Sequence, residues 1–327
     1  MEHAHLGRSG LLVSRIALGT MNFGDATGEA EAHEILDAAL EAGVNHIDTA
    51  DVYGGPQTPD MVQGYGTSEE IVGDWFARTG RRDEVVLATK VYQPMGTGPN
   101  DRHLSAYHLK RACEASLRRL RTDHIDLYQM HHVDRDTPFE EIWQAMDQLV
   151  TEGKITYVGS SNFAGWDVAT AQLTARSRNS LGLVSEQSFY NLANRAVEQE
   201  MIPALQHFGV GLLPWSPLFR GVLAGRDPGP DAVRRGSDGA QAERRRLADQ
   251  LARYEELCHR LGYAPAQVAQ AWLLHQPAVS AVIAGPRTTA QLRSSISALE
   301  IELDTATLAE LDRIWPGPGT APQSYAW

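Results

Sequence analysis

Short apolar runs of strand length alternate with longer stretches of helical spacing, and this alternation constrains the fold more than any other feature of the sequence. The strand-like runs cover residues 16–19, 45–49, 85–89, 125–130, 156–160, 183–186, 210–215 and 281–283. Helical spacing covers residues 30–42, 69–78, 104–120, 139–151, 166–175, 198–208, 266–275 and 289–298. Eight strands, each followed by a helix, predict an α/β protein of the closed (β/α)8 type, a TIM barrel.

The main alternative is an open, doubly wound sheet, which usually carries G-x-G-x-x-G after its first strand. The segment 20–25, with the sequence TMNFGD, lacks that fingerprint. We therefore predict a single barrel domain over residues 1–327, and any dinucleotide must be bound in another way.

Three segments lie outside this alternation. Residues 6–14 are typical of a short β-hairpin with its turn at Ser9-Gly10, which would plug the N-terminal end of the barrel. Residues 225–245 are rich in Gly, Pro, Asp and Arg, which predicts a loop over one face, followed by an extra helix at 244–261. After the breaker cluster at 316–319 we expect an irregular tail that packs on the surface.

Charge and composition exclude several classes of function. The net charge of −12 argues against nucleic acid and anionic membranes as partners, because both select for basic patches. The two cysteines, Cys113 and Cys258, exclude a disulfide scaffold and a cysteine-rich zinc site. The first residues do not read as a signal peptide, and no run of about 18 apolar residues predicts a membrane span. We expect a cytoplasmic protein with no membrane partner.

Polar residues follow the ends of several predicted strands, where (β/α)8 barrels carry their active sites. Lys90 ends the third strand, and a lysine at such a position is costly unless it is paired. Asp48 on the neighbouring strand could pair with it, Tyr53 could fold back over both, and His131 ends the fourth strand. These residue types predict a proton-donating site, because a cation beside a phenol lowers the tyrosine pKa from about 10.

Each of these residues also has a structural interpretation. Asp48 could cap a loop or a helix, Lys90 could be solvated, and Tyr53 could be a surface aromatic. His131 and His132 could be structural histidines, and without acidic partners at ligand spacing they do not predict a metal site. The functional interpretation is favoured because all of these types fall at consecutive strand ends of one barrel.

Several motifs resemble the aldo-keto reductase superfamily, and the resemblance covers nearly the whole chain. They are residues 18–24 (LGTMNFG), 45–54 (NHIDTADVYG), 126–131 (DLYQMH), 158–163 (VGSSNF) and 216–218 (SPL). The branch that the chain is most similar to contains bacterial reductases, β subunits of potassium channels and NDP-deoxysugar enoyl reductases of antibiotic pathways.

The resemblance implies reduction of an aldehyde or ketone to an alcohol by a catalytic tetrad of Tyr53, Lys90, Asp48 and His131. Tyr53 would be the general acid, and His131 would orient the substrate carbonyl. His132 would lie on the other strand face, against helices. The substrate pocket would be lined by rings, those of Phe23, Tyr53, Tyr92 and His131.

The same resemblance implies where a nicotinamide cofactor lies. The carboxamide would be bound by Ser161, Asn162 and Gln187, and the nicotinamide ring would stack on Trp215. Further contacts would come from strand ends and the loops after them: Gly19, Thr20, Met21, Asp48, Ser216, Pro217, Leu218, Gly221, Leu223, Gly225, Arg226, Gly285, Gln291 and Ser295. Among these, the backbone of 218–225 and Arg226 would hold the pyrophosphate. Arg287 would bind the 2′-phosphate, which favours NADPH over NADH because a guanidinium matches phosphate geometry.

The chain departs from the family in two places. Ser294 and Ser295 stand where an acid–amide pair usually binds adenine, which weakens the adenine contacts and leaves NADH as an alternative cofactor. Residues 55–64 form an insertion at the mouth of the site, either a wall of the substrate pocket or a neutral surface loop.

The resemblance thus implies a small-molecule carbonyl substrate and allows a homo-oligomer. Two alternatives stay open. One is an NDP-deoxysugar enoyl or keto reductase, because the tail after residue 316 resembles members that act in secondary metabolism. The other, outside enzymes, is a cofactor-sensing regulatory subunit like the channel β subunits. The substrate and the direction of the reaction do not follow from the sequence.

Overall fold

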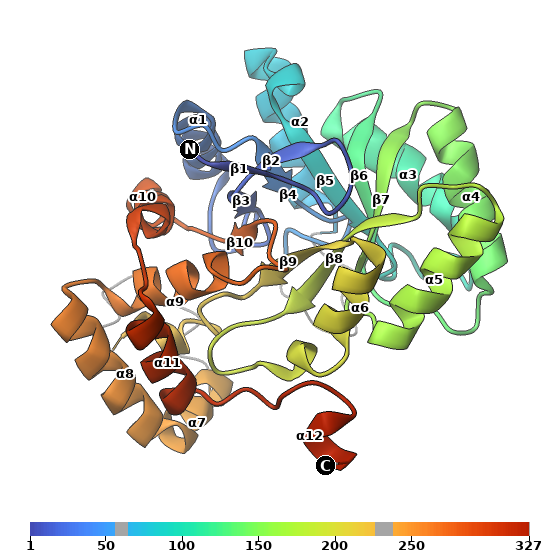
Figure 1. The fold of residues 1–327 in the computed structure, drawn as a ribbon. Helices are drawn as coiled ribbons and strands as arrows, with labels where there is room; N and C mark the ends of the chain where they lie inside the picture. The colour runs from blue at the N-terminus through green and yellow to red at the C-terminus, as the bar shows by residue number, and fades with distance from the viewer. Residues whose placement is uncertain (56–64, 226–237, 327) are drawn as a thin grey trace.

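Eight parallel strands form the wall of a nearly closed barrel (Figure 1). The computed structural model describes residues 1–55, 65–225 and 238–326. The strands are β3 (Ile16–Gly19), β4 (His46–Asp48), β5 (Val86–Val91), β6 (Ile125–Met130), β7 (Ile155–Ser161), β8 (Leu183–Phe189), β9 (Gly211–Trp215) and β10 (Val282–Ala284). They pair in the order β10-β3-β4-β5-β6-β7-β8-β9. The predicted (β/α)8 barrel is confirmed.

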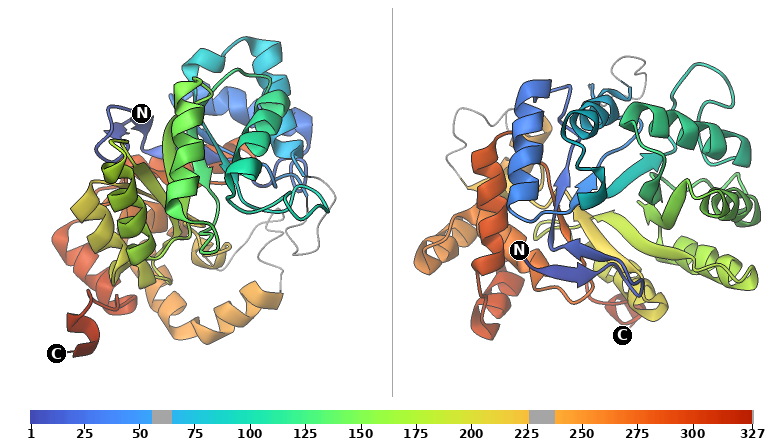
Figure 2. Two further views of the ribbon diagram at one scale, coloured as in Figure 1. Left: turned by 90° about the vertical axis from the view of Figure 1, so that its right-hand side faces the viewer. Right: turned by 90° about the horizontal axis from the view of Figure 1, so that it is seen from above.

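A helix follows each barrel strand and packs on the outside of the wall (Figure 2). These helices are α1 (Glu29–Glu41), α2 (Thr67–Thr79), α3 (Ala106–Leu120), α4 (Phe139–Thr151), α5 (Gly165–Ser177), α6 (Met201–Phe208), α9 (Pro265–Leu274) and α10 (Thr289–Ile296). Helix α4 illustrates why they form. Its residues Ile142, Met146 and Leu149 recur at helical spacing and are all buried, which gives the helix one apolar face toward the sheet.

Further helices lie outside this alternation. They are α7 (Asp238–Arg246), α8 (Ala248–Leu261), α11 (Thr305–Ile314) and α12 (Gln323–Ala326), with 3-10 turns at Arg82–Glu84, Ala196–Glu198, Val222–Ala224 and Ser297–Glu300. The single helix expected at 244–261 is two helices, since the chain leaves helical geometry at Leu247, which is buried. The first of them begins at Asp238, so the end of the segment 225–245, which was predicted as a loop, is helical. Helix α11 was not predicted, although Asp304 caps it through a 2.7 Å bond from the Thr307 backbone N–H.

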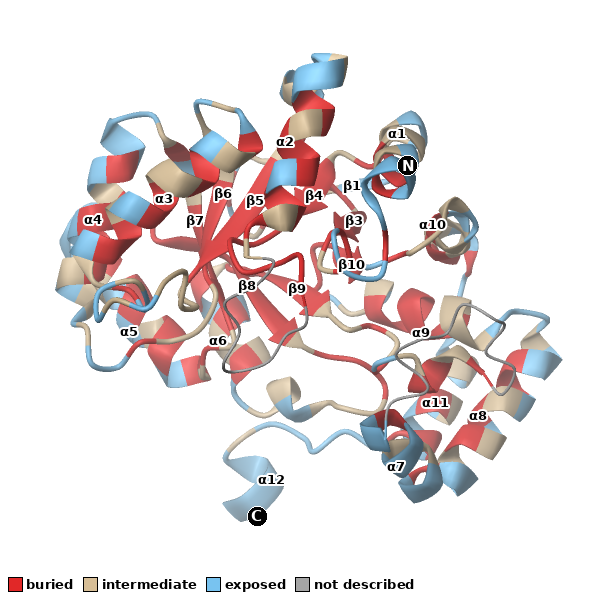
Figure 3. Ribbon diagram, turned by 180° about the vertical axis from the view of Figure 1, so that it is seen from behind, coloured by how far each residue is buried: buried red, intermediate tan, exposed pale blue. Residues whose placement is uncertain are grey.

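The tail differs from the irregular segment that the sequence predicts. It ends in α12, which is exposed and projects from the body of the protein (Figure 3). The tail is attached where the Ala321 N–H donates to the carbonyl of Gln199 at 2.9 Å.

An antiparallel hairpin at the N-terminus closes one end of the barrel. Its strands are β1 (His3–His5) and β2 (Leu12–Ser14), so the connection spans the whole of residues 6–11 rather than a tight turn at Ser9-Gly10. Leu6 and Val13 are fully buried in a cluster with barrel-interior residues that include Leu127. The expected hairpin is present, and its position agrees with the role of a plug.

The barrel closes through one residue of β9. Among the described residues, Leu212 makes both backbone bonds across this seam, donating to Ala278 and accepting from Ser280, each at 2.9 Å. The guanidinium of Arg15 lies beside the seam and donates to the carbonyls of Leu274, Val279 and Ser280. A side chain from the residue before β3 thus supplements a short stretch of strand pairing.

The barrel strands are buried along most of their lengths, and the outward faces of the surrounding helices are exposed (Figure 3). None of the described helices is long and apolar enough to cross a membrane.

Truncating the hairpin plug should cost stability. We expect Leu6→Ala to lower the free energy of unfolding by about 2–5 kcal/mol, because it leaves a cavity at the end of the barrel. Leu12 on the same hairpin is 49% exposed, so Leu12→Ala should change stability by less than about 0.5 kcal/mol. Chemical denaturation of both variants measures the difference. Equal effects would show that the hairpin does not seal the barrel.

Candidate active site

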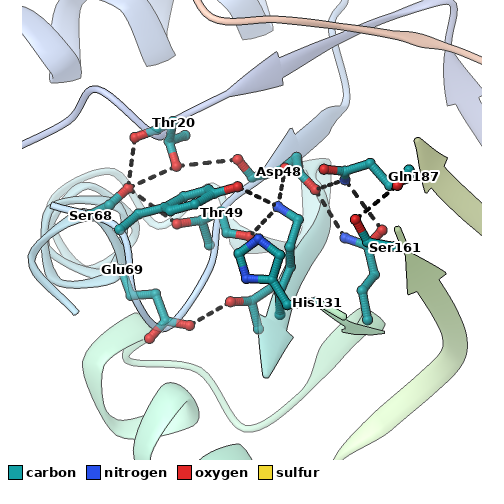
Figure 4. Close-up of polar contacts among 12 residues, drawn as sticks. Thr20, Asp48, Thr49, Ser68, Glu69, His131, Ser161 and Gln187 are labelled. Atoms are coloured by element: carbon teal, nitrogen blue, oxygen red, sulfur yellow. Dashed lines mark hydrogen bonds and ion pairs between the residues drawn. The ribbon is translucent and has the colours of Figure 1, made fainter. Parts of the chain in front are cut away.

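Lys90 is fully buried at the C-terminal end of β5, and all three donors of its ammonium group have acceptors. The Nζ atom donates to Asp48 Oδ1 at 2.5 Å, to the Thr49 carbonyl at 3.0 Å and to Tyr53 Oη at 3.1 Å. Figure 4 shows Asp48 and Thr49 in this network. The structure therefore brings together the phenol, the ammonium and the carboxylate that the sequence places at neighbouring strand ends.

Strand pairing explains this convergence. Asp48 is in register with Ala88, two residues before Lys90, and the period of two directs all three side chains into the barrel. The chain after β4 is then held against β5, because the Asp51 N–H donates to the Lys90 carbonyl at 3.2 Å. This turn carries Tyr53 back over the lysine, with Nζ 4.7 Å from the centre of the phenol ring.

The lysine charge is stabilised by its neighbours. Burial alone would lower the pKa of Lys90, but the Asp48 carboxylate and Tyr53 outweigh it and raise that pKa. Lys90 is therefore an ammonium at neutral pH.

His131 follows β6 and completes the cluster. Its backbone N–H donates to the Val91 carbonyl at 2.9 Å, and its ring meets Tyr53 edge to face with 5.7 Å between centroids (Figure 4). Burial, then the Lys90 charge and His132, hold the pKa of His131 well below its usual value. The imidazole is neutral, so one ring nitrogen donates a hydrogen bond and the other accepts one.

The expected position of His132 is wrong. Its ring stacks on His131 at 5.2 Å and 14°, and on its other side it contacts Tyr92 at 5.2 Å, which in turn contacts His103. Strand β6 ends at Met130, so the in-and-out alternation of a strand no longer applies to His132. Tyr92 thus belongs to a row of rings that leads from exposed His103 to buried Tyr53.

Several residues that support the cluster were not predicted as site residues, among them Gln129, Ser68 and Glu69. Gln129 and Gln187 both donate to Asp48 Oδ2, at 2.9 and 2.8 Å. Ser68 on α2 bonds the hydroxyls of Thr20 and Thr49, and Glu69 accepts from Thr89 at 2.5 Å (Figure 4). The sequence carries a signal for Gln129, which shares the inward face of β6 with Leu127 and precedes His131 by two residues.

The residues expected at the carboxamide lie together beside this cluster. The Ser161 hydroxyl donates to the Gln187 carbonyl at 2.8 Å, and Asn162 Nδ2 donates to Ser161 Oγ at 3.0 Å and to the His131 carbonyl at 3.1 Å. Trp215 Nε1 donates to Asn162 Oδ1 at 3.2 Å. Asn162 has a φ of +59°, a left-handed conformation that asparagine tolerates better than most residues.

Glu186 is a buried residue beside this group of residues. It accepts from the Phe163 N–H at 3.2 Å, from Ser188 Oγ at 2.9 Å and from Ser160 Oγ. Burial raises its pKa to about 7, against the opposing effect of these hydrogen bonds. The carboxyl group ties the loop after β7 to the end of β8.

The loop after β9 has an unusual backbone. Ser216, Phe219 and Arg220 have φ values of +54°, +48° and +55° without being glycine, and Gly221 and Gly225 also have positive φ values. Such strained conformations cluster at ligand-binding loops. Within this loop the Leu218 carbonyl accepts from the N–H groups of Gly221 and Leu223. Pro217 lies between the strained residues, and Arg226 lies outside the described residues.

The segment after β10 is ordered by its own side chains. The Arg287 N–H donates to Gln291 Oε1 at 2.8 Å, and Thr288 caps α10 by accepting from the Gln291 N–H. The Arg287 side chain is half-buried and makes no ion pair or hydrogen bond with the described residues. Gly285 is exposed before it, and Ser295 is buried on α10.

Several of the expected site residues are engaged in packing within the protein. Phe23 is fully buried in the main apolar core, and Thr20 is fully buried with its hydroxyl bonded to Ser68. Gly19 packs so closely on β10 that an added Cβ would lie 2.8 Å from Ile283 Cγ2. Met21 is half-buried and packs against the cluster that contains Tyr53. Of the insertion at 55–64, only Gly55 is among the described residues.

Comparison with known proteins agrees with this geometry. Residues 15–316 match the model of the Aldo/keto reductase family. The chain is 49% identical to "Uncharacterized oxidoreductase YrpG" of Bacillus subtilis, over all of both chains. It is 33% identical to "Versiconal hemiacetal acetate reductase" of Aspergillus parasiticus, over 95% of this chain and 96% of the relative. It is 32% identical to "Probable voltage-gated potassium channel subunit beta" of Arabidopsis thaliana, over 99% and 100%.

His46 lies on the inward face of β4, two residues before Asp48, and should make stability depend on pH. Burial lowers its pKa from 6.5 to about 4, and its ring nitrogens have no hydrogen-bond partner among the described residues. Below pH 6.5 the His46 imidazole is protonated in the unfolded chain but stays neutral in the folded protein. Stability is therefore lost as the pH falls from 6.5 to about 4.

We expect wild-type stability to fall relative to His46→Leu by about 2 kcal/mol between pH 7.5 and 5. Urea unfolding of both proteins across this range measures the difference. His259→Leu, at an exposed position on α8, should keep the wild-type dependence. A wild-type curve parallel to that of His46→Leu would contradict the burial argument.

Proposed function

Because the chain belongs to the aldo/keto reductase family, whose members here include oxidoreductases, we propose that it is an NADPH-dependent carbonyl reductase. The observation that carries the proposal is the convergence on one buried ammonium. Lys90 Nζ lies 2.5 Å from Asp48 Oδ1 and 3.1 Å from Tyr53 Oη, with His131 against the phenol ring. A tyrosine so placed can serve as a general acid.

Each group then has a definite task. Tyr53 Oη donates its proton to the carbonyl oxygen of an aldehyde or ketone. The Lys90 ammonium stabilises the phenolate that remains, and Asp48 holds Lys90 in place. Neutral His131 donates a hydrogen bond to the same oxygen and so orients the substrate. A proton from solvent restores the phenol.

The residues beside this cluster fit a nicotinamide cofactor. When bound, NADPH supplies the hydride that the carbonyl carbon receives. Ser161, Asn162 and Gln187 present amide and hydroxyl groups suited to a carboxamide, and Trp215 presents a ring for stacking. The strained loop at 216–225 suits a pyrophosphate, because backbone N–H groups in such turns bind anions.

Arg287 supports NADPH over NADH. Its guanidinium makes no hydrogen bond or ion pair with the described residues. It lies before the N-terminus of α10, where both the helix dipole and the cation favour a phosphate.

The relative named for a hemiacetal acetate supports a carbonyl-derived substrate. A turnover screen that includes sugar nucleotides separates this proposal from the sugar-nucleotide reductase, and absence of turnover with tight cofactor binding would favour the sensing subunit.

Removing the phenol should remove most turnover. We expect Tyr53→Phe to lower kcat by about 10²–10⁴-fold while NADPH binding persists, since only the proton donor is lost. NADPH absorbance with an aldehyde panel measures turnover, and fluorescence titration measures binding. Tyr128→Phe is the matched control, because Tyr128 is a buried tyrosine on β6 that donates to Leu109 away from the site. Full activity in Tyr53→Phe would refute the assignment of the acid.

Replacing Arg287 tests the choice of cofactor. We expect Arg287→Met to weaken NADPH binding by about 10–100-fold, because charge-assisted hydrogen bonds to the 2′-phosphate are lost, and to leave NADH binding unchanged. Arg293→Met, at an exposed position on α10, should affect neither cofactor. Equal weakening of NADPH and NADH would contradict a contact with the 2′-phosphate.

A further inference from the structure

The two oxygens of the Asp48 carboxylate serve different partners. Oδ1 accepts from the Lys90 ammonium, whereas Oδ2 accepts from the side-chain amides of Gln129 and Gln187, at 2.9 and 2.8 Å. Figure 4 shows Gln187 bonded to Asp48 on the side away from Thr20. All of these side chains are at least 97% buried, so water does not compete for their hydrogen bonds.

The Asp48 carboxylate determines the orientation of the Gln129 and Gln187 side-chain amides. An ionised carboxylate only accepts hydrogen bonds, so each glutamine must present its NH2 group to Oδ2 and direct its carbonyl oxygen elsewhere. The carbonyl oxygen of Gln129 accepts from Gln187 Nε2 at 3.4 Å. The NH2 group of Gln187 is therefore held by two acceptors, and its amide has one favoured orientation.

The backbone of Gln187 is also engaged. Its carbonyl accepts from the Ser161 hydroxyl at 2.8 Å and from the Asn162 N–H at 3.1 Å. With the NH2 group and the backbone carbonyl both committed, the side-chain oxygen is the group that Gln187 offers to a ligand. An oxygen in that position selects a ligand that donates an N–H.

Packing alone does not account for Gln129. It lies on β6 between two inward-facing residues, apolar Leu127 and His131. A buried amide costs free energy unless its hydrogen bonds are made, and an apolar side chain of similar length would fill the same space without that cost. The NH2 group of Gln129 donates to Asp48, and its carbonyl oxygen accepts from Gln187, so both polar groups of the amide are satisfied by these two residues.

We propose that Gln129 is a positioning residue that, together with Asp48, orients Gln187 to read the N–H of the cofactor carboxamide. This inference rests on the proposed function, since it concerns the same cofactor. In this arrangement the buried Asp48 carboxylate has two roles. It orients Gln187 for amide recognition, and it pairs with Lys90 beside the proton donor. Gln129 acts through its neighbours and touches neither substrate nor cofactor.

The test compares NADP+ with its 3-acetylpyridine analogue, in which a methyl ketone replaces the carboxamide and no N–H can be donated. Titrations that follow tryptophan fluorescence give both dissociation constants. Wild type should prefer NADP+. Gln129→Met should lower this preference by about 3- to 10-fold, because Gln187 is no longer held in one orientation. Gln129→Leu repeats the measurement should the methionine variant fail to fold.

A double-variant cycle separates positioning from general destabilisation. Gln187→Met should remove the preference, and adding Gln129→Met to it should cause no further loss, because residues that act as one unit are not additive. Gln172→Met is the matched control. Gln172 is a buried glutamine on α5 whose amide bonds the Leu183 backbone, so its loss should lower stability and keep the preference.

The outcomes are distinct. An unchanged preference in folded Gln129 variants, or additive losses in the double variant, would overturn the positioning role and leave the proposed reductase intact. A wild-type protein that binds neither dinucleotide would overturn the proposed function and this inference together.

Discussion

An ammonium group taken wholly out of water must be paired, and the candidate site is organised around that requirement. Lys90 is fully buried, and a bare charge at such depth would cost several kcal/mol or more. The protein meets this cost with a carboxylate, a backbone carbonyl and a phenol around one nitrogen atom. Removing any of these acceptors leaves the charge partly unsatisfied, so the positions of Asp48 and Tyr53 follow from the burial of Lys90.

The barrel makes this arrangement accessible. Adjacent parallel strands end at the same rim, so residues distant in sequence meet without long connections: Asp48 on β4, Lys90 on β5, Gln129 on β6 and Gln187 on β8. The hydrogen bonds run from Tyr53 through Lys90 and Asp48, and then across the barrel interior to Gln187. The proposed acid and the proposed amide-binding glutamine are therefore joined by side-chain contacts inside the rim.

Much of the fold could be predicted because periodicity and strand ends are local signals. The eight strands, their following helices and the cluster of Tyr53, Lys90, Asp48 and His131 appear where apolar runs end in polar residues. The division of the extra helix at Leu247 could not be predicted, since helical spacing continues through it. The sequence places Gln129 on the inward face of β6, but its role could not be predicted, because it depends on an acceptor on another strand.

Two positions show how tertiary context overrides a motif. Phe23 lies in a family-like segment, yet packing draws its ring into the core. His132 leaves the strand pattern one residue after His131, and stacking of aromatic rings then determines its place. In both cases packing in the folded chain decides the direction of the side chain, which a single sequence does not contain.

The seam of the barrel is the weakly paired side of its wall. Among the described residues, only Leu212 makes backbone hydrogen bonds between β9 and the chain before β10. Arg15 bridges the carbonyls alongside, and β4, β5 and β6 lie across the ring from that joint. The loop at 216–225 and the turn with Arg287 both emerge beside it. Spreading at this joint would change the gap between those two loops without altering the spacing of the phenol, lysine and carboxylate, which lie on other strands. The proposed dinucleotide site thus lies on the side of the wall with the least strand pairing, and the proposed proton donor lies on the opposite, fully paired side.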